Sequence, residues 1–183
     1  MSLESKLKIA EAFEKLLQKN SILKISVSDI TEAVGLSRQT FYNNFLDIYD
    51  LVYWMHSEHL REIVEAFWEN EDFCHTFETA LHIMRAHKVF YEQAIRKKGI
   101  NSFQELFYLR NLEQSAVRIQ QVAGREILED ERFLLDLYWR GAAQMVADWI
   151  SSGMQMEPVD LACLFYEGLP QKLQPYWPNK TRR

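Results

Sequence analysis

Apolar residues recur every three or four positions along nearly the whole chain, which is the spacing of amphipathic helices. No apolar-polar alternation long enough for a strand interrupts this pattern. The spacing predicts helices over residues 3–19, 26–34, 37–45, 47–68, 72–86, 87–98, 102–122, 129–152 and 158–173. The chain is therefore predicted to be all-α, with regular structure ending before Pro175 and Pro178.

Residues 26–45 predict two short helices joined by a tight turn. Ser26 stands three residues before Asp29, the spacing of a capping box that begins a helix. Gly35 follows that helix, and glycine adopts the left-handed backbone of a helix end without steric cost. Ser37 then caps the second helix. The expected buried positions of the flanking helices are Leu7, Ala10, Phe13, Leu16 and Leu17 before the motif, and Val27, Ile30, Ala33 and Val34 within it.

The second short helix has an apolar side and a polar side. Phe41 and Phe45, four residues apart, lie on the inward face. The outward side chains are Arg38, Gln39, Thr40, Tyr42, Asn43 and Asn44. Hydrogen-bonding groups of this kind, with little charge, suit base edges and phosphate oxygens in the major groove of DNA. The motif is therefore a candidate helix-turn-helix.

Charge limits the kind of nucleic-acid binder that this chain can be. The formal net charge is −5, and residues 1–50 hold six basic and seven acidic side chains. The outward-facing helix nevertheless carries Arg38 and no acid. We therefore expect modest non-specific affinity and a shallow dependence on salt.

Composition indicates a folded protein that works inside the cell. Of the 183 residues, 48% are hydrophobic and 13% aromatic, which is ample for a core. Cys74 and Cys163 are far apart, as expected of reduced thiols. No signal peptide and no membrane span are recognisable, so the expected location is cytoplasmic.

The order of one N-terminal helix, the helix-turn-helix, a long connecting helix and a helical remainder resembles the TetR family of transcriptional regulators. The matching positions lie within residues 8–52 and are Ile9, Ala10, Ala12, Phe13, Gly35, Leu36, Ser37, Thr40, Phe41, Tyr42 and Phe45. Residues 138–165 are similar to a branch that includes regulators of dihydroxyacetone kinase operons. The resemblance implies a three-helix DNA-binding domain over residues 1–50 and a helical bundle for effector binding and dimerisation over residues 51–183.

The resemblance also implies roles in binding double-stranded DNA. The expected DNA-binding residues are Ser28, Ser37, Arg38, Gln39, Thr40, Tyr42, Asn43 and Asn44. Thr40 and Tyr42 match positions that contact phosphate, and Gln39 and Asn43 match positions that meet base edges. One departure is Ile48, where the family usually has a phosphate-contacting lysine.

The resemblance also implies a homodimer that reads a palindromic operator. Such a dimer holds its two recognition helices one helical turn of DNA apart, about 34–36 Å, or a multiple of that distance. The last two long helices, 129–152 and 158–173, are the expected interface. Gly141, Ala142, Ala143 and Ala147 give the first of them a small-residue face. The alternative is that this face packs within one chain.

The resemblance further implies that an unknown small-molecule effector controls the regulator. A cavity that binds this effector is expected among the central helices. Its candidate lining residues are Trp54, Phe90, Tyr91, Phe103, Phe107, Tyr108, Arg110 and Gln144. The alternative is that these aromatic residues form plain core and that a protein partner controls the regulator, which would then act as an activator. A domain without a cavity, or an apolar patch outside the dimer interface, would favour the partner.

Metal and enzyme chemistry find little support in the sequence. His56 and His59 share a helix face and His75 adjoins Cys74, but no third ligand follows at a suitable spacing. No glycine-rich phosphate loop and no nucleophile elbow is present. We therefore expect no catalytic residues, no metal and no cofactor.

Overall fold

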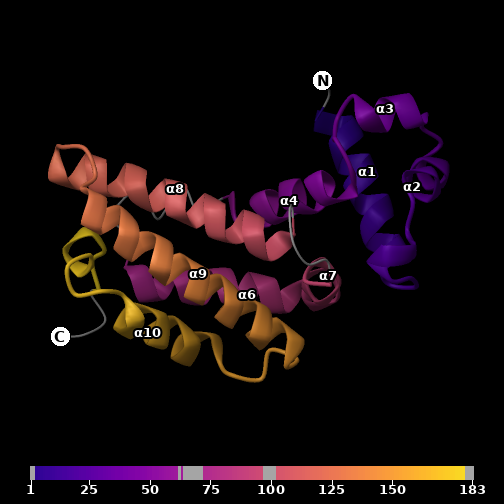
Figure 1. The fold of residues 1–183 in the computed structure, drawn as a ribbon. Helices are drawn as coiled ribbons and strands as arrows, with labels where there is room; N and C mark the ends of the chain where they lie inside the picture. The colour runs from indigo at the N-terminus through magenta and orange to yellow at the C-terminus, as the bar shows by residue number, and fades with distance from the viewer. Residues whose placement is uncertain (1–2, 62, 64–71, 97–101, 180–183) are drawn as a thin grey trace.

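The chain folds into a small N-terminal head and a longer helical bundle. The computed structural model describes residues 3–61, 63, 72–96 and 102–179, and every regular element within these ranges is a helix. In Figure 1 the head lies at the upper right and the bundle at the left, joined through α4 (Ile48–His59). The predicted all-α fold is confirmed.

The described part of the head consists of α-helices and one short 3-10 turn. They are α1 (Leu3–Leu17), η1 (Ile22–Lys24), α2 (Val27–Val34) and α3 (Arg38–Tyr42). Ile9, Phe13, Ile30 and Phe41 are fully buried and form the centre of its core. Two predicted core positions are wrong, because Leu7 and Ala33 are exposed. Thr31 is buried instead, and its hydroxyl donates to the backbone of α2.

The predicted capping chemistry of the helix-turn-helix is confirmed. The Asp29 N–H donates to Ser26 Oγ at 3.2 Å, and the Ser26 N–H donates to Asp29 Oδ2 at 2.7 Å. Gly35 ends α2 at φ +65°, in the left-handed region. The Thr40 N–H donates to Ser37 Oγ at 3.1 Å. These caps fix where α2 and α3 begin, and so fix the angle at which α3 faces solvent.

The connecting helix α4 is shorter than predicted. It begins after Asp47, whose side chain accepts from the N–H groups of Tyr49 and Asp50, and it ends at His59. Beyond it, Leu60 is a turn, residues 61 and 63 are helical, and residues 62 and 64–68 of the predicted 47–68 helix lie outside the described residues. Helix boundaries of this kind depend on tertiary packing rather than on local periodicity.

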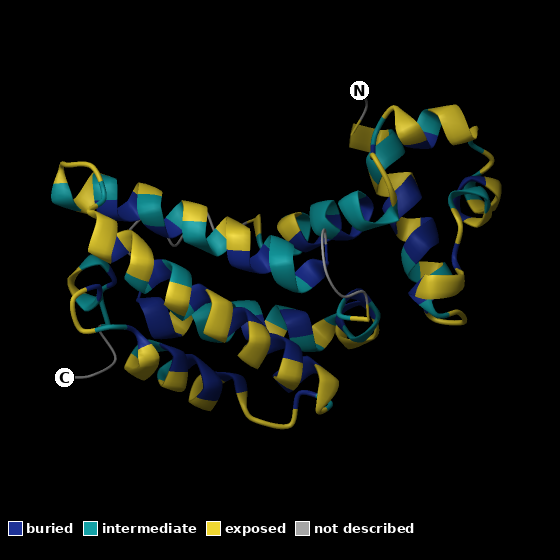
Figure 2. Ribbon diagram, in the orientation of Figure 1, coloured by how far each residue is buried: buried dark blue, intermediate teal, exposed yellow. Residues whose placement is uncertain are grey.

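The described part of the bundle consists of five helices and a terminal turn. They are α6 (Phe73–Ala86), α7 (Lys88–Ala94), α8 (Phe103–Ala123), α9 (Glu129–Ser151), α10 (Pro158–Gly168) and η2 (Gln174–Tyr176). Helices α8 and α9 pack side by side, as do α6 and α10, and their buried faces meet inside the bundle (Figure 2). The last helix ends five residues earlier than predicted, and Pro175 lies within η2 rather than beyond all regular structure.

Aromatic residues near the C-terminus are part of the bundle. Trp177 is 2% exposed, and the Phe73 N–H donates to the Pro178 carbonyl at 2.9 Å. Arg118 Nε donates to the Tyr176 carbonyl at 2.8 Å. Among the described helices, none is long and apolar enough to cross a membrane.

A buried carboxylate fixes the start of α9. Glu131 is 1% exposed and accepts two hydrogen bonds from Arg125, at 2.9 and 2.8 Å. It also accepts from the Leu128 N–H and from the Tyr176 hydroxyl. The bonds from Arg125, opposed by burial, hold the pKa of Glu131 at about 2. Glu131 therefore joins the α8–α9 turn to the C-terminal turn.

Glu131→Gln should lower the free energy of unfolding at pH 7 by about 2 kcal/mol, because hydrogen bonds to a charged group are lost. The folded-state pKa of Glu131 lies below its ordinary value of 4.5, so its contribution is complete above pH 4.5 and is lost as the pH falls toward 2. Urea unfolding at several pH values should show the difference between wild type and variant shrinking over that range.

The exposed neighbour Glu129 supplies the control for this experiment. Glu129→Gln should leave the free energy of unfolding nearly unchanged at every pH. A Glu131→Gln difference that stayed constant down to about pH 2.5, well below the ordinary carboxylate pKa, would contradict the charge argument.

Candidate nucleic-acid interface and cavity

The exposed face of α3 presents an ordered amide pair. Gln39 and Asn43 are both exposed, and Gln39 Nε2 donates to Asn43 Oδ1 at 2.9 Å. Because the side chains are four residues apart, they stand one above the other on the same helix face. The pair leaves the Gln39 oxygen and the Asn43 amino group for a ligand, which is the donor and acceptor set that an adenine edge requires.

Arg38 connects the two helices of the motif. Its guanidinium donates to Ser28 Oγ on α2 at 3.1 Å and to the Tyr42 hydroxyl at 3.4 Å. Both contacts are exposed, so a phosphate can replace either acceptor with little rearrangement. The structure thus brings Ser28, Arg38 and Tyr42 together on one surface.

Three further predicted residues hold the shape of the head. The Ser37 and Thr40 hydroxyls lie 2.9 Å apart, and Asn44 Nδ2 donates to the Thr40 carbonyl at 2.7 Å. Asn44 Oδ1 is buried with no hydrogen-bond partner in the described structure. Asn44 therefore closes the end of α3 and points its oxygen inward, unlike Gln39 and Asn43.

The region next to α3 is acidic rather than basic. Asp47 caps α4, and the Leu46 N–H donates to Asp50 Oδ2 at 2.9 Å. Ile48, at the first position of α4, is half-buried against the core. A carboxylate thus occupies the helix N-terminus that could otherwise receive a phosphate oxygen.

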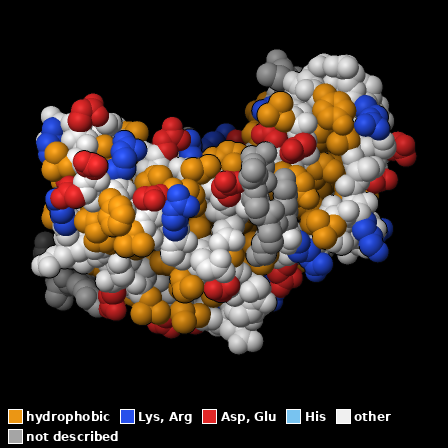
Figure 3. All heavy atoms as spheres, viewed as in Figure 1, with side chains coloured by type: hydrophobic (Ala, Val, Ile, Leu, Met, Phe, Trp, Pro, Cys, Tyr) orange, Lys and Arg blue, Asp and Glu red, His pale blue; other side chains and the backbone are white. Residues whose placement is uncertain are grey.

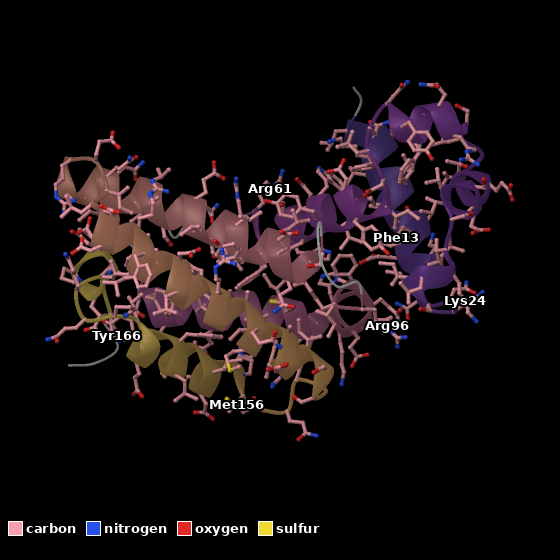
Figure 4. All side chains as sticks on the ribbon, viewed as in Figure 1. Phe13, Lys24, Arg61, Arg96, Met156 and Tyr166 are labelled. Carbon is pink, nitrogen blue, oxygen red and sulfur yellow. The ribbon has the colours of Figure 1, made fainter. Side chains whose placement is uncertain are left out.

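A cavity of about 390 Å³, partly open to solvent, lies in the bundle between α4, α6, α8 and α9. Its described walls are mainly apolar and aromatic, with polar groups at a few points. The lining includes His56, Leu60, Arg61, Phe73, Thr76, Phe77, Ala80, Leu81, Met84, Phe107, Arg110, Asn111, Gln114, Ser115, Trp139, Val146 and Trp177. Figure 4 labels Arg61, which lies near α8.

The cavity includes two of the eight residues that the sequence suggested for effector binding, Phe107 and Arg110. Phe90, Tyr91 and Phe103 are instead buried core beside His56 and His59. Trp54 packs on Phe45 at the border with the head.

The other two candidates lie between α8 and α9, where Tyr108 is buried and Gln144 is exposed. Tyr108 hydrogen-bonds Asp136 and Arg140, and Gln144 accepts from Gln104 at 2.7 Å. The cavity residues that the sequence did not predict include Phe77, Trp139 and Trp177. Phe77 and Trp139 lie within predicted helices and Trp177 lies beyond the last of them. Nothing local indicates whether a buried side chain meets another side chain or a cavity.

Two histidines, His56 buried and His59 half-buried, extend from the cavity wall toward the head. The Tyr91 hydroxyl lies 3.0 Å from His56 Nδ1 and 3.3 Å from His59 Nδ1. Burial, together with the neighbouring His59, lowers the pKa of His56 to about 3. Burial, together with the neighbouring His87, lowers the pKa of His59 to about 4. Both imidazoles are therefore neutral at pH 7.

The small-residue face predicted on α9 divides into two parts. Ala142, Ala143 and Ala147 are buried within the chain, so the intrachain alternative is correct for them. Their small side chains allow the close approach of neighbouring helices. Gly141 is exposed and belongs to a stripe at every fourth residue with Phe133, Leu137 and Met145, which are 67%, 61% and 50% exposed.

Comparison with known proteins identifies the bundle. A family model described as "Transcriptional regulator C-terminal region" (TetR_C_8) matches residues 71–169. The HTH-type dhaKLM operon transcriptional activator DhaS of Lactococcus lactis subsp. lactis (strain IL1403) is 38% identical over 68 residues. That alignment covers 34% of this chain and only 36% of the relative, about a third of its length.

Two solved structures share the fold. One, titled dihydroxyacetone kinase operon activator DhaS, has a TM-score of 0.66 at 20% identity and covers 97% of this chain and 100% of its own. The other is the TetR family repressor AlkX from Dietzia sp. strain DQ12-45-1b, with a TM-score of 0.56, 16% identity and coverage of 93% and 95%. The family model matches more than half of the residues of this chain, and the chain therefore belongs to the TetR family of transcriptional regulators.

Proposed function

We propose that this regulator reads a palindromic operator as a homodimer, with α3 of each copy in the major groove of double-stranded DNA. The observation that carries the proposal is the exposed Gln39–Asn43 pair, held on a capped helix at the edge of the head. The acidic border and half-buried Ile48 keep this binding weak on non-specific DNA. The phosphates on either side would be bound by the surrounding polar side chains, Ser28, Ser37, Arg38, Thr40 and Tyr42.

The proposed dimer interface is the exposed stripe of α9 together with α10. Hydrophobic side chains gather among charged ones over these two helices on the face shown in Figure 3. Phe133, Leu137 and Met145 from α9 and Leu164 from α10, which is 51% exposed, supply apolar area. Exposed Gly141 lets two copies of α9 approach closely. Burying such a stripe against its symmetry mate would give a four-helix interface.

A small molecule is the favoured controller, because the bundle contains a cavity of ordinary ligand-site size. Its aromatic walls, with Thr76, Asn111 and Gln114 among them, suit a largely apolar compound that carries one or two hydrogen-bonding groups.

Control by a protein partner is the second candidate. It is supported by apolar side chains that are exposed on α8, outside the proposed dimer helices, namely Leu109, Val117 and Val122. The matched relative is also named an activator. A partner that binds α8 could then take the place of a small molecule.

Selection of bound fragments from genomic DNA by the purified protein, at two salt concentrations, tests the DNA-reading proposal. A palindromic site recovered at both concentrations is the expected result. Recovery of no enriched sequence, by protein that is folded and dimeric, would overturn it.

Asn43→Ala should relax preference at one base pair in each half-site, because a base contact contributes about 1–3 kcal/mol of discrimination. Binding to the recovered operator and to single-base variants, measured by fluorescence anisotropy, checks this. Asn20→Ala is the matched control, since Asn20 is exposed on the head but lies outside α3. Equal loss of affinity on all operator variants would place Asn43 on phosphate instead.

Ile48→Lys should strengthen binding to all DNA sequences. It should also steepen the salt dependence of the affinity by the amount expected for about one added phosphate contact per head. The new ammonium would stand at the start of α4, beside the DNA-facing surface. The slope of log affinity against log salt concentration gives the measurement. Gln121→Lys adds the same charge at the exposed C-terminal end of α8, the end of the bundle farthest from the head in Figure 1, and should leave the slope unchanged. If the two variants behave alike, Ile48 does not face phosphate.

Ala80→Trp should fill the cavity and block ligands, because the indole ring would project from α6 into the described lining. Binding of the apolar dye anilinonaphthalene sulfonate, followed by fluorescence, should weaken at least tenfold while operator binding persists. Thr79→Trp, one residue away and outside the described lining, is the control. Unchanged dye binding in Ala80→Trp would rule out this cavity as the apolar binding site.

A further inference from the structure

Three metal-ligating side chains from separate elements meet where the bundle contacts the head. Glu14 lies on α1, His59 is the last residue of α4, and His87 lies between α6 and α7. The Oε1 atom of Glu14 is 3.9 Å from His59 Nε2 and 3.5 Å from His87 Nδ1. One ligand atom from each residue lies within 4.8 Å of the others.

Local spacing does not predict this group. It places His59 beside His56 and offers no third ligand. The fold brings in Glu14 from 45 residues earlier and His87 from 28 residues later. In Figure 1, α7 lies where the bundle meets the head, which is why these distant residues converge.

The surroundings of the group resemble those of a built metal site. The Tyr91 hydroxyl contacts His59 Nδ1 at 3.3 Å and so leaves His59 Nε2 directed at Glu14. An outer partner of this kind fixes the orientation of a ligating imidazole. The neighbouring cation, Lys88, is bonded to the Gly153 carbonyl at 3.1 Å and lies 3.7 Å from Glu92, so it does not occupy the carboxylate of Glu14.

There is also space and access for an ion. A surface cavity of about 240 Å³ adjoins the group and is lined by Glu14, Gln18 and His87 among others. The side chains of Glu14 and His87 are each 40% exposed, whereas that of His59 is 14% exposed. His59 is therefore the most constrained of the three side chains, and the two others can adjust.

One adjustment is required. The rings of His59 and His87 are stacked, with centroids 3.9 Å apart and an angle of 17° between their planes. Two parallel rings cannot both direct an in-plane lone pair at one ion. His87 must rotate out of the stack on binding, and its exposure permits that rotation.

We propose that Glu14, His59 and His87 bind a divalent first-row transition ion, of which Zn²⁺ is the best match. Two imidazoles and one carboxylate are the donors that Zn²⁺ takes when solvent supplies the fourth ligand. Mg²⁺ and Ca²⁺ prefer oxygen ligands alone and do not suit two nitrogens.

The ion would connect the two parts of the regulator. Glu14 belongs to the head, whereas both histidines belong to the bundle or its connecting helix. A bound ion therefore restricts how the head moves relative to the bundle and selects one spacing of the reading heads in a dimer. This regulatory consequence rests on the proposed DNA-binding function, but the ion site itself does not.

Zn²⁺ titration of the untagged full-length protein against a chromophoric chelator tests the site directly. The expected result is one ion per chain with a dissociation constant of about 1 µM or lower, or roughly −8 kcal/mol. Glu14→Gln and His87→Asn should each weaken Zn²⁺ binding at least about tenfold, because the loss of even an outer-shell partner usually weakens metal binding by about that factor. Both side chains are partly exposed, so both variants should fold.

His82→Asn is the matched control, because His82 is an exposed histidine 3.8 Å from Glu78 and lies outside the proposed group. It should bind Zn²⁺ like the wild type. The proposal is overturned if the wild type binds no ion in this range, or if His82→Asn loses as much affinity as His87→Asn.

A second measurement separates the site from its regulatory role. Operator affinity should change with Zn²⁺ for the wild type and for His82→Asn, but not for Glu14→Gln. Tight Zn²⁺ binding without any effect on operator affinity would keep the metal site and refute the coupling. Loss of operator binding in all proteins would count against the DNA-reading proposal and leave the chelator result standing.

Discussion

Helix α4 packs against both parts of the molecule, so its position couples the head to the bundle. Trp54 packs on Phe45 from the head, while His56 contacts Tyr91 from α7. The C-terminal end of α4 lines the cavity, and Ile48 begins the helix beside α3. Under the proposed function, a ligand that favours one position of this helix also favours one position of the head. Operator affinity and ligand affinity must then change reciprocally.

The electrostatics of the head favour selectivity over strength. Arg38 is the one cation on α3, and the start of α4 is capped by Asp47 rather than left open to phosphate. Under the proposed function, binding would draw more on the Gln39–Asn43 pair and on dimer symmetry than on counterion release. A regulator of this kind would occupy few non-specific sites, which suits control through modest changes in affinity.

Local sequence was sufficient to predict most of the helices and the chemistry of the helix-turn-helix. Ser26, Gly35 and Ser37 act on residues within a few positions of themselves, so their capping roles follow from spacing. The inward position of Phe41 and the outward position of Gln39 likewise follow from the period of one helix. The resemblance to the TetR family rested on this local pattern, and the family is confirmed.

Packing between helices determines which buried residues surround a cavity, which face of α9 stays exposed and which ligands converge. Phe103 and Phe107 lie four residues apart on α8, yet Phe107 lines the cavity whereas Phe103 packs beside His56. The separated residues Glu14 and His87 meet only because of how the helices that carry them pack together. None of this could be read from the sequence, because periodicity fixes the direction of a side chain but not what it meets.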